Sequence, residues 1–138
     1  MRRIICVGNR YVLEDSAGPA VHERLARDGV PAGVELVDGG LGGLSLLRHV
    51  EGTERVVFVD RTSGLGAEGA VVVLTAEEVA GTASGAYGHD AGLAYLLRAI
   101  PHVLEGALPE IAVVGMEGLP SDELVSEAAR VSLGIVTR

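Results

Sequence analysis

Five short apolar runs, separated by segments with helical periodicity, constrain the fold of this chain more than any other feature. The runs occupy residues 3–8, 34–37, 56–59, 70–74 and 111–114. Apolar runs of this length, bounded by turn residues, are typical of buried β-strands. The predicted helices lie between them and at the end, at residues 17–27, 44–50, 75–79, 89–99 and after Ser121. Alternating strands and helices predict an α/β fold with a mainly parallel sheet.

Local residue patterns also predict where two of these helices begin and where two of the strands lie in the sheet. Thr75 with Glu78 matches a capping box, and Ser121 is a typical N-cap residue for the last helix. Residues 56–59 form the most apolar run, so we expect them to be a central strand buried on both faces. Residues 70–74 are predicted at an edge.

The composition fits one globular domain spanning residues 1–138. Hydrophobic residues make up 48% of the chain and aromatic residues only 3%, so the core is expected to be aliphatic. A chain of 138 residues can bury a substantial core but is too short for two ordinary domains. The net charge of −8 argues against nucleic-acid binding, because phosphates attract a basic surface. A basic protein partner or a metal ion is compatible with that charge.

The chain has one cysteine and no long apolar segment. Cys6 lies within the first apolar run, so we expect a small buried residue and no internal disulfide. A reducing compartment fits this cysteine usage. No apolar run approaches the roughly 20 residues of a membrane-spanning helix. We therefore expect a cytoplasmic protein that does not enter the membrane.

Three polar residues follow predicted strands or loops in a pattern that suggests a site. Asp15, next to Glu14, comes after the first strand; Asp60 ends the central strand; and His89 begins a helix after a glycine-rich loop. If the first and third strands are neighbours, both aspartates lie at the same edge of the sheet, where open α/β sheets bind ligands. Two carboxylates and an imidazole suit a divalent first-row transition metal.

Each residue of this set also has an ordinary structural explanation. Asp15 could complement the dipole of the following helix, and Asp60 could stabilise a turn after its strand. His89 could be an exposed helical residue without a role. Two further positions could line the same edge: Asp38, followed by two glycines after the second strand, and Glu117, after the last strand.

Five motifs in a fixed order provide a second line of argument. They are Val7-Gly8-Asn9 with Glu14-Asp15 and Gly18; Val37-Asp38-Gly39-Gly40; Val57-Phe58-Val59-Asp60; His89 with Gly92-Leu93; and Val113-Val114-Gly115. In this order and spacing, over nearly the whole chain, they resemble the hydrogenase maturation endopeptidases. Members of that family remove the C-terminal extension of the nickel-iron hydrogenase large-subunit precursor.

The resemblance implies a fold, an activity and a site. The fold would be a three-layer α/β/α sandwich with a mainly parallel five-stranded sheet. The activity would be cleavage of the precursor after nickel insertion, with the nickel supplied by the precursor itself. Carried over to this chain, the catalytic and nickel-binding residues would be Asp15, Asp60 and His89. The residues that face the substrate would be Asn9, Asp38, Gly39 and Gly40.

Two residues depart from the family pattern. Cys6 replaces the first glycine of the usual Gly-x-Gly-Asn turn, and Arg61 follows Asp60 where the family usually has a small residue. A guanidinium beside a metal-binding carboxylate would either pair with it and weaken metal binding, or point away and bind substrate. The sequence leaves both alternatives open.

Two other functions remain possible from the sequence. The chain could be an inactive relative that binds or chaperones the same precursor, and Arg61 favours this alternative. It could also be a small-molecule α/β enzyme or a nucleotide-binding domain. The turn after the first strand lacks the Gly-x-Gly-x-x-Gly pattern that lets the backbone approach a pyrophosphate, and two nearby acids would repel phosphate. The order of preference is therefore endopeptidase, binding module, small-molecule enzyme.

Overall fold

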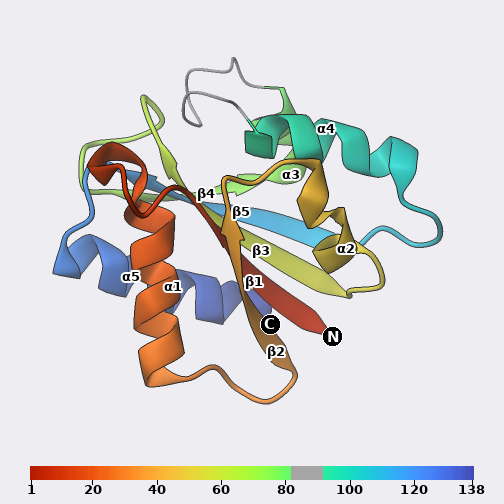
Figure 1. Ribbon diagram of the computed structural model, residues 1–138, viewed down its shortest axis with the longest axis horizontal. Helices are drawn as coiled ribbons and strands as arrows, with labels where there is room; N and C mark the ends of the chain where they lie inside the picture. The colour runs from red at the N-terminus through yellow and green to blue at the C-terminus, as the bar shows by residue number, and fades with distance from the viewer. Residues whose placement is uncertain (82–91) are drawn as a thin grey trace.

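A twisted sheet of five strands forms the middle layer of the protein (Figure 1). The structure is a computed structural model and describes residues 1–81 and 92–138. The strand order is β2-β1-β3-β5-β4, and β4 is antiparallel to β5 while the other neighbours are parallel. The strands are β1 (Arg2–Val7), β2 (Val34–Gly40), β3 (Arg55–Thr62), β4 (Val71–Thr75) and β5 (Glu110–Glu117). The predicted sheet and the edge position of residues 70–74 are confirmed.

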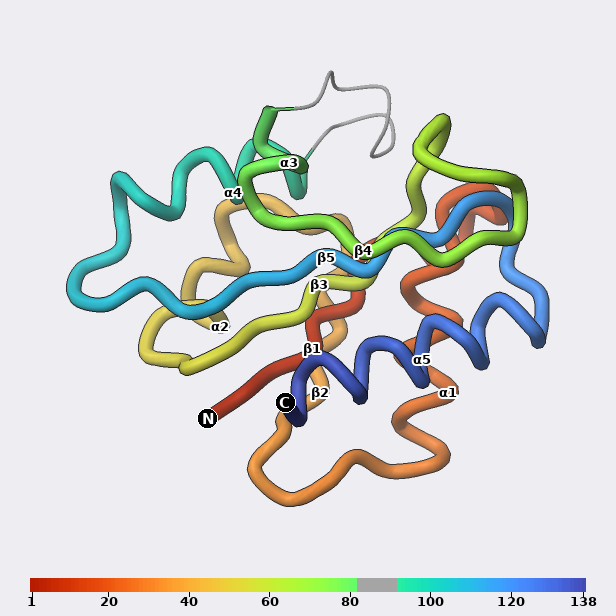
Figure 2. Tube along the Cα trace, turned by 180° about the vertical axis from the view of Figure 1, so that it is seen from behind, coloured from red at the N-terminus to blue at the C-terminus, as the bar shows by residue number. Residues whose placement is uncertain are grey.

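Helices cover both faces of the sheet, as the three-layer prediction requires (Figures 1 and 2). One face carries α1 (Ala17–Asp28) and α5 (Asp122–Val136), and the other carries α2 (Leu47–Val50), α3 (Ala76–Ala80) and α4 (Gly92–Val103). Short 3-10 turns, η1 (Leu13–Asp15) and η2 (Leu44–Leu46), precede α1 and α2. The predicted capping box of α3 is present, and the Ser121 side chain caps α5.

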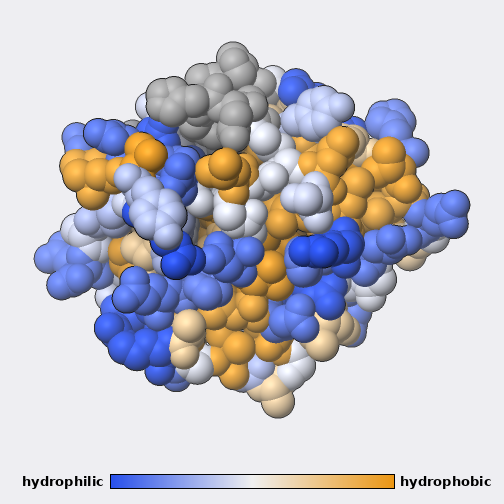
Figure 3. All heavy atoms as spheres, in the orientation of Figure 1, coloured by the Kyte–Doolittle hydropathy of each residue, from blue (hydrophilic) through white to orange (hydrophobic). Residues whose placement is uncertain are grey.

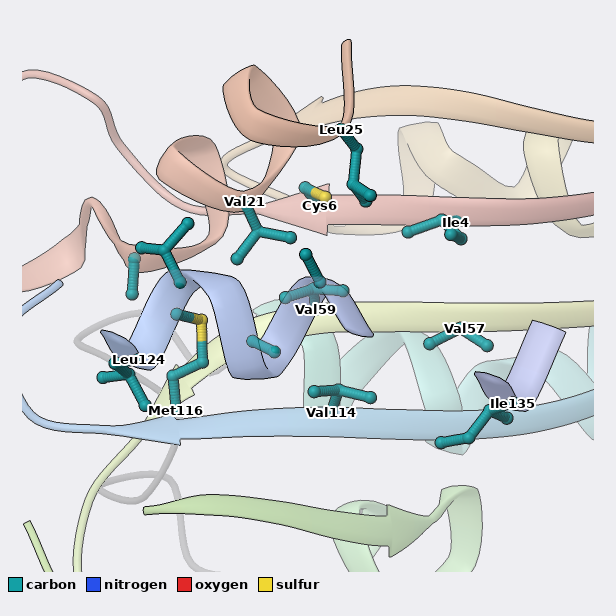
Figure 4. Packing of buried hydrophobic residues seen from close by; sticks show 14 of the residues in the cluster. Ile4, Cys6, Val21, Leu25, Val57, Val59, Val114, Met116, Leu124 and Ile135 are labelled. Carbon is teal, nitrogen blue, oxygen red and sulfur yellow. The ribbon is translucent and has the colours of Figure 1, made fainter. Parts of the chain in front are cut away.

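The two central strands divide the core because alternate residues of a strand point to opposite faces. Ile4 and Val59 pack under α1 and α5, whereas Ile5 and Phe58 pack on the side of α2, α3 and α4. Figure 4 shows the first of these clusters, with Cys6 inside it. Cys6 is fully buried as expected, and burial raises the pKa of its thiol well above the ordinary range, with a smaller contribution from the charge of Asp38.

Three strands extend further toward their carboxyl ends than the apolar runs predicted. β2 continues through Gly40, β3 continues past Asp60 to Thr62, and β5 continues to Glu117. At the end of the sheet Asp60 pairs with Gly115 and Thr62 pairs with Glu117. Ladder hydrogen bonds join backbone groups, so a pairing can continue into residues whose side chains are polar.

The fourth predicted helix corresponds to α4, which is described from Gly92 onward. Its predicted first residue, His89, lies outside the described residues, and the described helix runs from Gly92 to Val103, past the predicted end at residue 99. Among residues 1–81 and 92–138, no helix combines the length and the apolar character needed to span a membrane.

Candidate active site

The turn after β1 holds the backbone of Asp15 against the end of that strand. Gly8 N donates to Gly40 O at 2.7 Å, and Asn9 N donates to Asp15 O at 2.9 Å. Gly8 has a φ of +144°, and a Cβ on it would lie 2.8 Å from Cδ of Pro19. Only glycine fits this position without strain. The glycine of the predicted Gly-Asn turn is thus what allows η1 to fold back over β1.

The first turn of α1 lies directly on the ends of β1 and β3. A Cβ built on Gly18 would overlap Val7 O and would lie 3.0 Å from Val59 O. A side chain at this position would push the helix away from both strands. Because Asp15 lies three residues before Gly18 in the chain, this contact fixes Asp15 near the carboxyl ends of β1 and β3.

Asp15 and Asp60 therefore belong to one edge of the sheet. β1 and β3 are neighbours, with Cys6 paired to Val59, so Asp60 is one residue beyond the last pair. Asp60 is 3% exposed, and its Oδ1 accepts a hydrogen bond of 2.8 Å from Arg61 N. The adjacency of the two strands, on which the sequence argument depended, is confirmed by the strand order.

Arg61 pairs with Asp15 across this edge. Its Nε lies 3.7 Å from Asp15 Oδ1, and the two side chains are 20% and 26% exposed. Nε is inaccessible to solvent and has no hydrogen-bond partner among the described residues. Of the two alternatives for Arg61, the structure shows pairing with a candidate ligand. Arg61 also lines a pocket of about 300 Å³ together with Ser63 and Glu68.

The residues predicted to face the substrate lie at the same edge, Asn9 in the turn after β1 and the other three in the outer strand β2. Asp38 is exposed; its Oδ2 pairs with Arg10 at 2.6 Å and its Oδ1 accepts from Gly40 N at 3.1 Å. The segment of Asp38, Gly39 and Gly40 is the end of β2 rather than a loop after it. Asn9 Oδ1 accepts from Tyr11 N at 2.9 Å, so this side chain shapes the turn before η1.

Apolar surface borders this edge of the sheet. Figure 3 shows exposed apolar atoms over η1 and beside the carboxyl end of β2. Leu13 of η1 and Leu41, which follows β2, are each 59% exposed. A protein partner that covers the edge would remove these side chains from water, which favours association.

Glu117 lies at this edge of the sheet, as the sequence suggested, and its carboxylate is occupied by neighbouring groups of the protein. It is 3% exposed; its Oε1 accepts from Leu65 N at 3.0 Å and from Gly66 N at 3.1 Å, and its Oε2 accepts from the Thr62 hydroxyl. All these contacts are to the loop between β3 and β4 and to the end of β3. Glu117 therefore orders that loop, and no local motif links it to residues so distant in sequence.

The donor set at the edge is suited to a divalent cation. Asp15 and Asp60 supply carboxylate oxygens, and first-row divalent metals accept such ligands together with imidazole. Within residues 1–81 and 92–138, no group of three histidine, cysteine, aspartate or glutamate side chains is arranged to hold a metal. The third predicted ligand, His89, lies outside the described residues.

Comparisons with known proteins agree with the fold and the motifs. A family model described as hydrogenase maturation protease matches residues 19–130. The hydrogenase maturating endopeptidase HybD from E. coli is 22% identical with a TM-score of 0.78, over 99% of this chain and 91% of that one. The [NiFe] hydrogenase maturation protease HycI from Thermococcus kodakarensis KOD1 is 21% identical with a TM-score of 0.72, over 99% and 90%.

A third solved structure matches over almost all of both chains. The [NiFe] hydrogenase maturation protease HybD from Thermococcus kodakarensis is 25% identical with a TM-score of 0.69, over 98% of each chain. A search of the curated proteins gave no match. The family model covers most of the sequence and the solved structures share the whole fold, so the chain belongs to the hydrogenase maturation protease family.

Proposed function

We propose that the protein is an endopeptidase that removes the C-terminal extension of a nickel-iron hydrogenase large-subunit precursor after nickel has been inserted. The observation that carries this proposal is the position of Asp15 and Asp60 at the ends of neighbouring parallel strands, in a chain of the maturation protease family. The nickel belongs to the precursor, so it is part of the substrate and not a resident cofactor of the protease.

Under this proposal, the substrate would bind at the edge of the sheet. Asp15 and Asp60, with His89, would contact the nickel that the precursor presents. The end of β2, with Asp38, and the exposed Leu13 and Leu41 would contact the precursor chain around it. Docking would then place the C-terminal extension at the edge only when the metal is in place.

The chemical step is hydrolysis of one peptide bond. A carboxylate of the pair would act as general base and take a proton from water while the water oxygen adds to the carbonyl carbon. The C–N bond then breaks, and the departing amine takes up the proton. The products are the mature C-terminus, a carboxylate, and the released extension with a free amino group.

The test is mass spectrometry of a nickel-iron hydrogenase large subunit from the same genome, incubated with this protein with and without nickel loading. We expect a loss of C-terminal mass only from the nickel-loaded precursor. Loss of the same mass without nickel would contradict the metal requirement. An intact precursor that does not bind the protein would contradict the proposed substrate.

A binding module without protease activity is the second candidate. The pairing of Arg61 with Asp15 favours it, because a paired carboxylate is less available to a metal or to water. This candidate predicts that the precursor copurifies with the protein at full length under the conditions of the same experiment.

A further inference from the structure

We propose that Arg61 is a specificity-determining residue: its guanidinium acts as a built-in counter-cation for Asp15, so that the site responds to nickel held by a precursor and not to free metal ions. This inference rests on the proposed function for its biological meaning. The inference itself is that one side chain competes with a metal ion for one carboxylate. This competition can be measured on this chain alone.

The position of Arg61 in β3 directs it toward Asp15. Val57, Val59 and Arg61 alternate along β3, so Arg61 shares the face that α1 and α5 cover. The 3-10 turn η1 carries Asp15 to the same face just before α1 begins. The guanidinium therefore reaches the carboxylate from inside the fold.

The contact is close enough to compete with a metal but is not a strong hydrogen-bonded pair. Nε lies 3.7 Å from Asp15 Oδ1, beyond hydrogen-bond distance, and it has no hydrogen-bond partner among the described residues although solvent does not reach it. Fork-like arginine–carboxylate pairs with two short hydrogen bonds are the stable form of this interaction. Through Nε, Arg61 thus supplies positive charge to Asp15 without a short hydrogen bond from that atom.

The structure also offers a place to which the guanidinium can move. A pocket of about 300 Å³ is lined by Arg61 itself together with Ser63, Gly64 and the exposed Glu68. A side chain that leaves Asp15 could enter this pocket and remain near a negative charge. A precursor that docks on the edge gains contacts beyond the metal, and these can offset the displacement of Arg61, whereas a free ion gains none.

The experiment measures Ni²⁺ affinity of the tag-free protein by isothermal titration calorimetry, without any precursor. Because removing a positive charge about 4 Å from a carboxylate strengthens its attraction for a cation, we expect Arg61→Ala to bind Ni²⁺ at least roughly tenfold more tightly than the wild type. Arg61→Met should show the same gain, since it keeps the length of the side chain without its charge and covers the case in which the alanine variant does not fold.

Two controls make the result specific. Arg10→Ala removes a positive charge from the same edge and releases the exposed Asp38, so it should change the affinity less than roughly threefold if only Asp15 matters. The double variant Arg61→Ala with Asp15→Asn should lose the gain. Unchanged affinity in both Arg61 variants, or a gain that survives the loss of the Asp15 charge, would overturn the proposal.

The result of the calorimetry does not depend on the proposed function. Nickel affinity is measured on the free chain, so a protein that cleaves no precursor can still show the gain in the Arg61 variants. Conversely, if those variants process the precursor correctly and their nickel affinity is unchanged, the proposed role of Arg61 is wrong and the proposed endopeptidase function is still supported.

Discussion

Thr62 and Glu117 face each other across the β3–β5 pair, and the Thr62 hydroxyl donates a hydrogen bond to the carboxylate of Glu117. Both side chains are buried. The other oxygen of the same carboxylate accepts two backbone N–H groups, from Leu65 and Gly66. One buried acid therefore joins the ends of two strands to the loop that lies beside Arg61.

Removing this carboxylate should destabilise the protein. Glu117→Ala leaves one buried and two partly buried donors without their acceptor, and we expect a loss of about 2–4 kcal/mol in the free energy of unfolding. Urea denaturation monitored by circular dichroism gives this value. Glu105→Ala removes an exposed acid and should change it by less than about 0.5 kcal/mol. Equal effects of the two substitutions would mean that Glu117 does not hold the loop.

Two glycines in helices should respond in opposite directions to substitution by alanine. Gly18→Ala places a methyl group against Val7 O at the ends of the strands, so we expect a loss of at least about 2 kcal/mol and weaker processing. Gly134 has open space around it in α5, so Gly134→Ala should be neutral or stabilise by up to about 1 kcal/mol. Thermal unfolding measures the stability of each variant relative to the wild type. A stable Gly18→Ala variant would contradict the close contact of α1 with the strands.

The site variants should separate activity from stability. Under the proposed function, Asp15→Asn and His89→Ala should each lower precursor processing by at least roughly a hundredfold, because they remove groups that contact the reacting centre. The side chain of Asp15 is about a quarter exposed, so the fold should survive its substitution with a change within about 1 kcal/mol. Processing is followed by mass spectrometry and folding by circular dichroism. If either variant processes the precursor normally, the assignment of that residue to the site is wrong.

Cys6 should be chemically silent in the folded protein. Its pKa is raised above the ordinary value of 9.0, chiefly because the thiol is buried, so the reactive thiolate is not formed near pH 8. We expect labelling by iodoacetamide at pH 8 to be at least roughly a hundredfold slower than in denaturant. The measurement is intact-mass analysis over time. Rapid labelling of the native protein would show that β1 opens readily.

Much of the architecture is encoded in local patterns. The apolar runs mark all five strands, most clearly the inner strands β1, β3 and β5, because a strand in the middle of a covered sheet must be apolar on both faces. The Thr75 and Glu78 capping box formed as predicted because its hydrogen bonds join residues only three apart. The order of the motifs also indicated the maturation protease family, which the family model then established.

Other features follow only from the packed structure. Strand order brings Asp15 and Asp60 to one edge, and the same order gives Arg61 a partner in Asp15 and Glu117 a role in the β3–β4 loop. The sequence placed Asp15 and Asp60 at one edge only on the condition that the first and third strands are neighbours. The contacts of Arg61 and Glu117 join residues that are distant in sequence, so no local pattern predicts them. The sequence alone determined which residue types were available at each strand end. Tertiary structure decided which charges meet there, because that depends on how the strands pair and on which face each side chain lies.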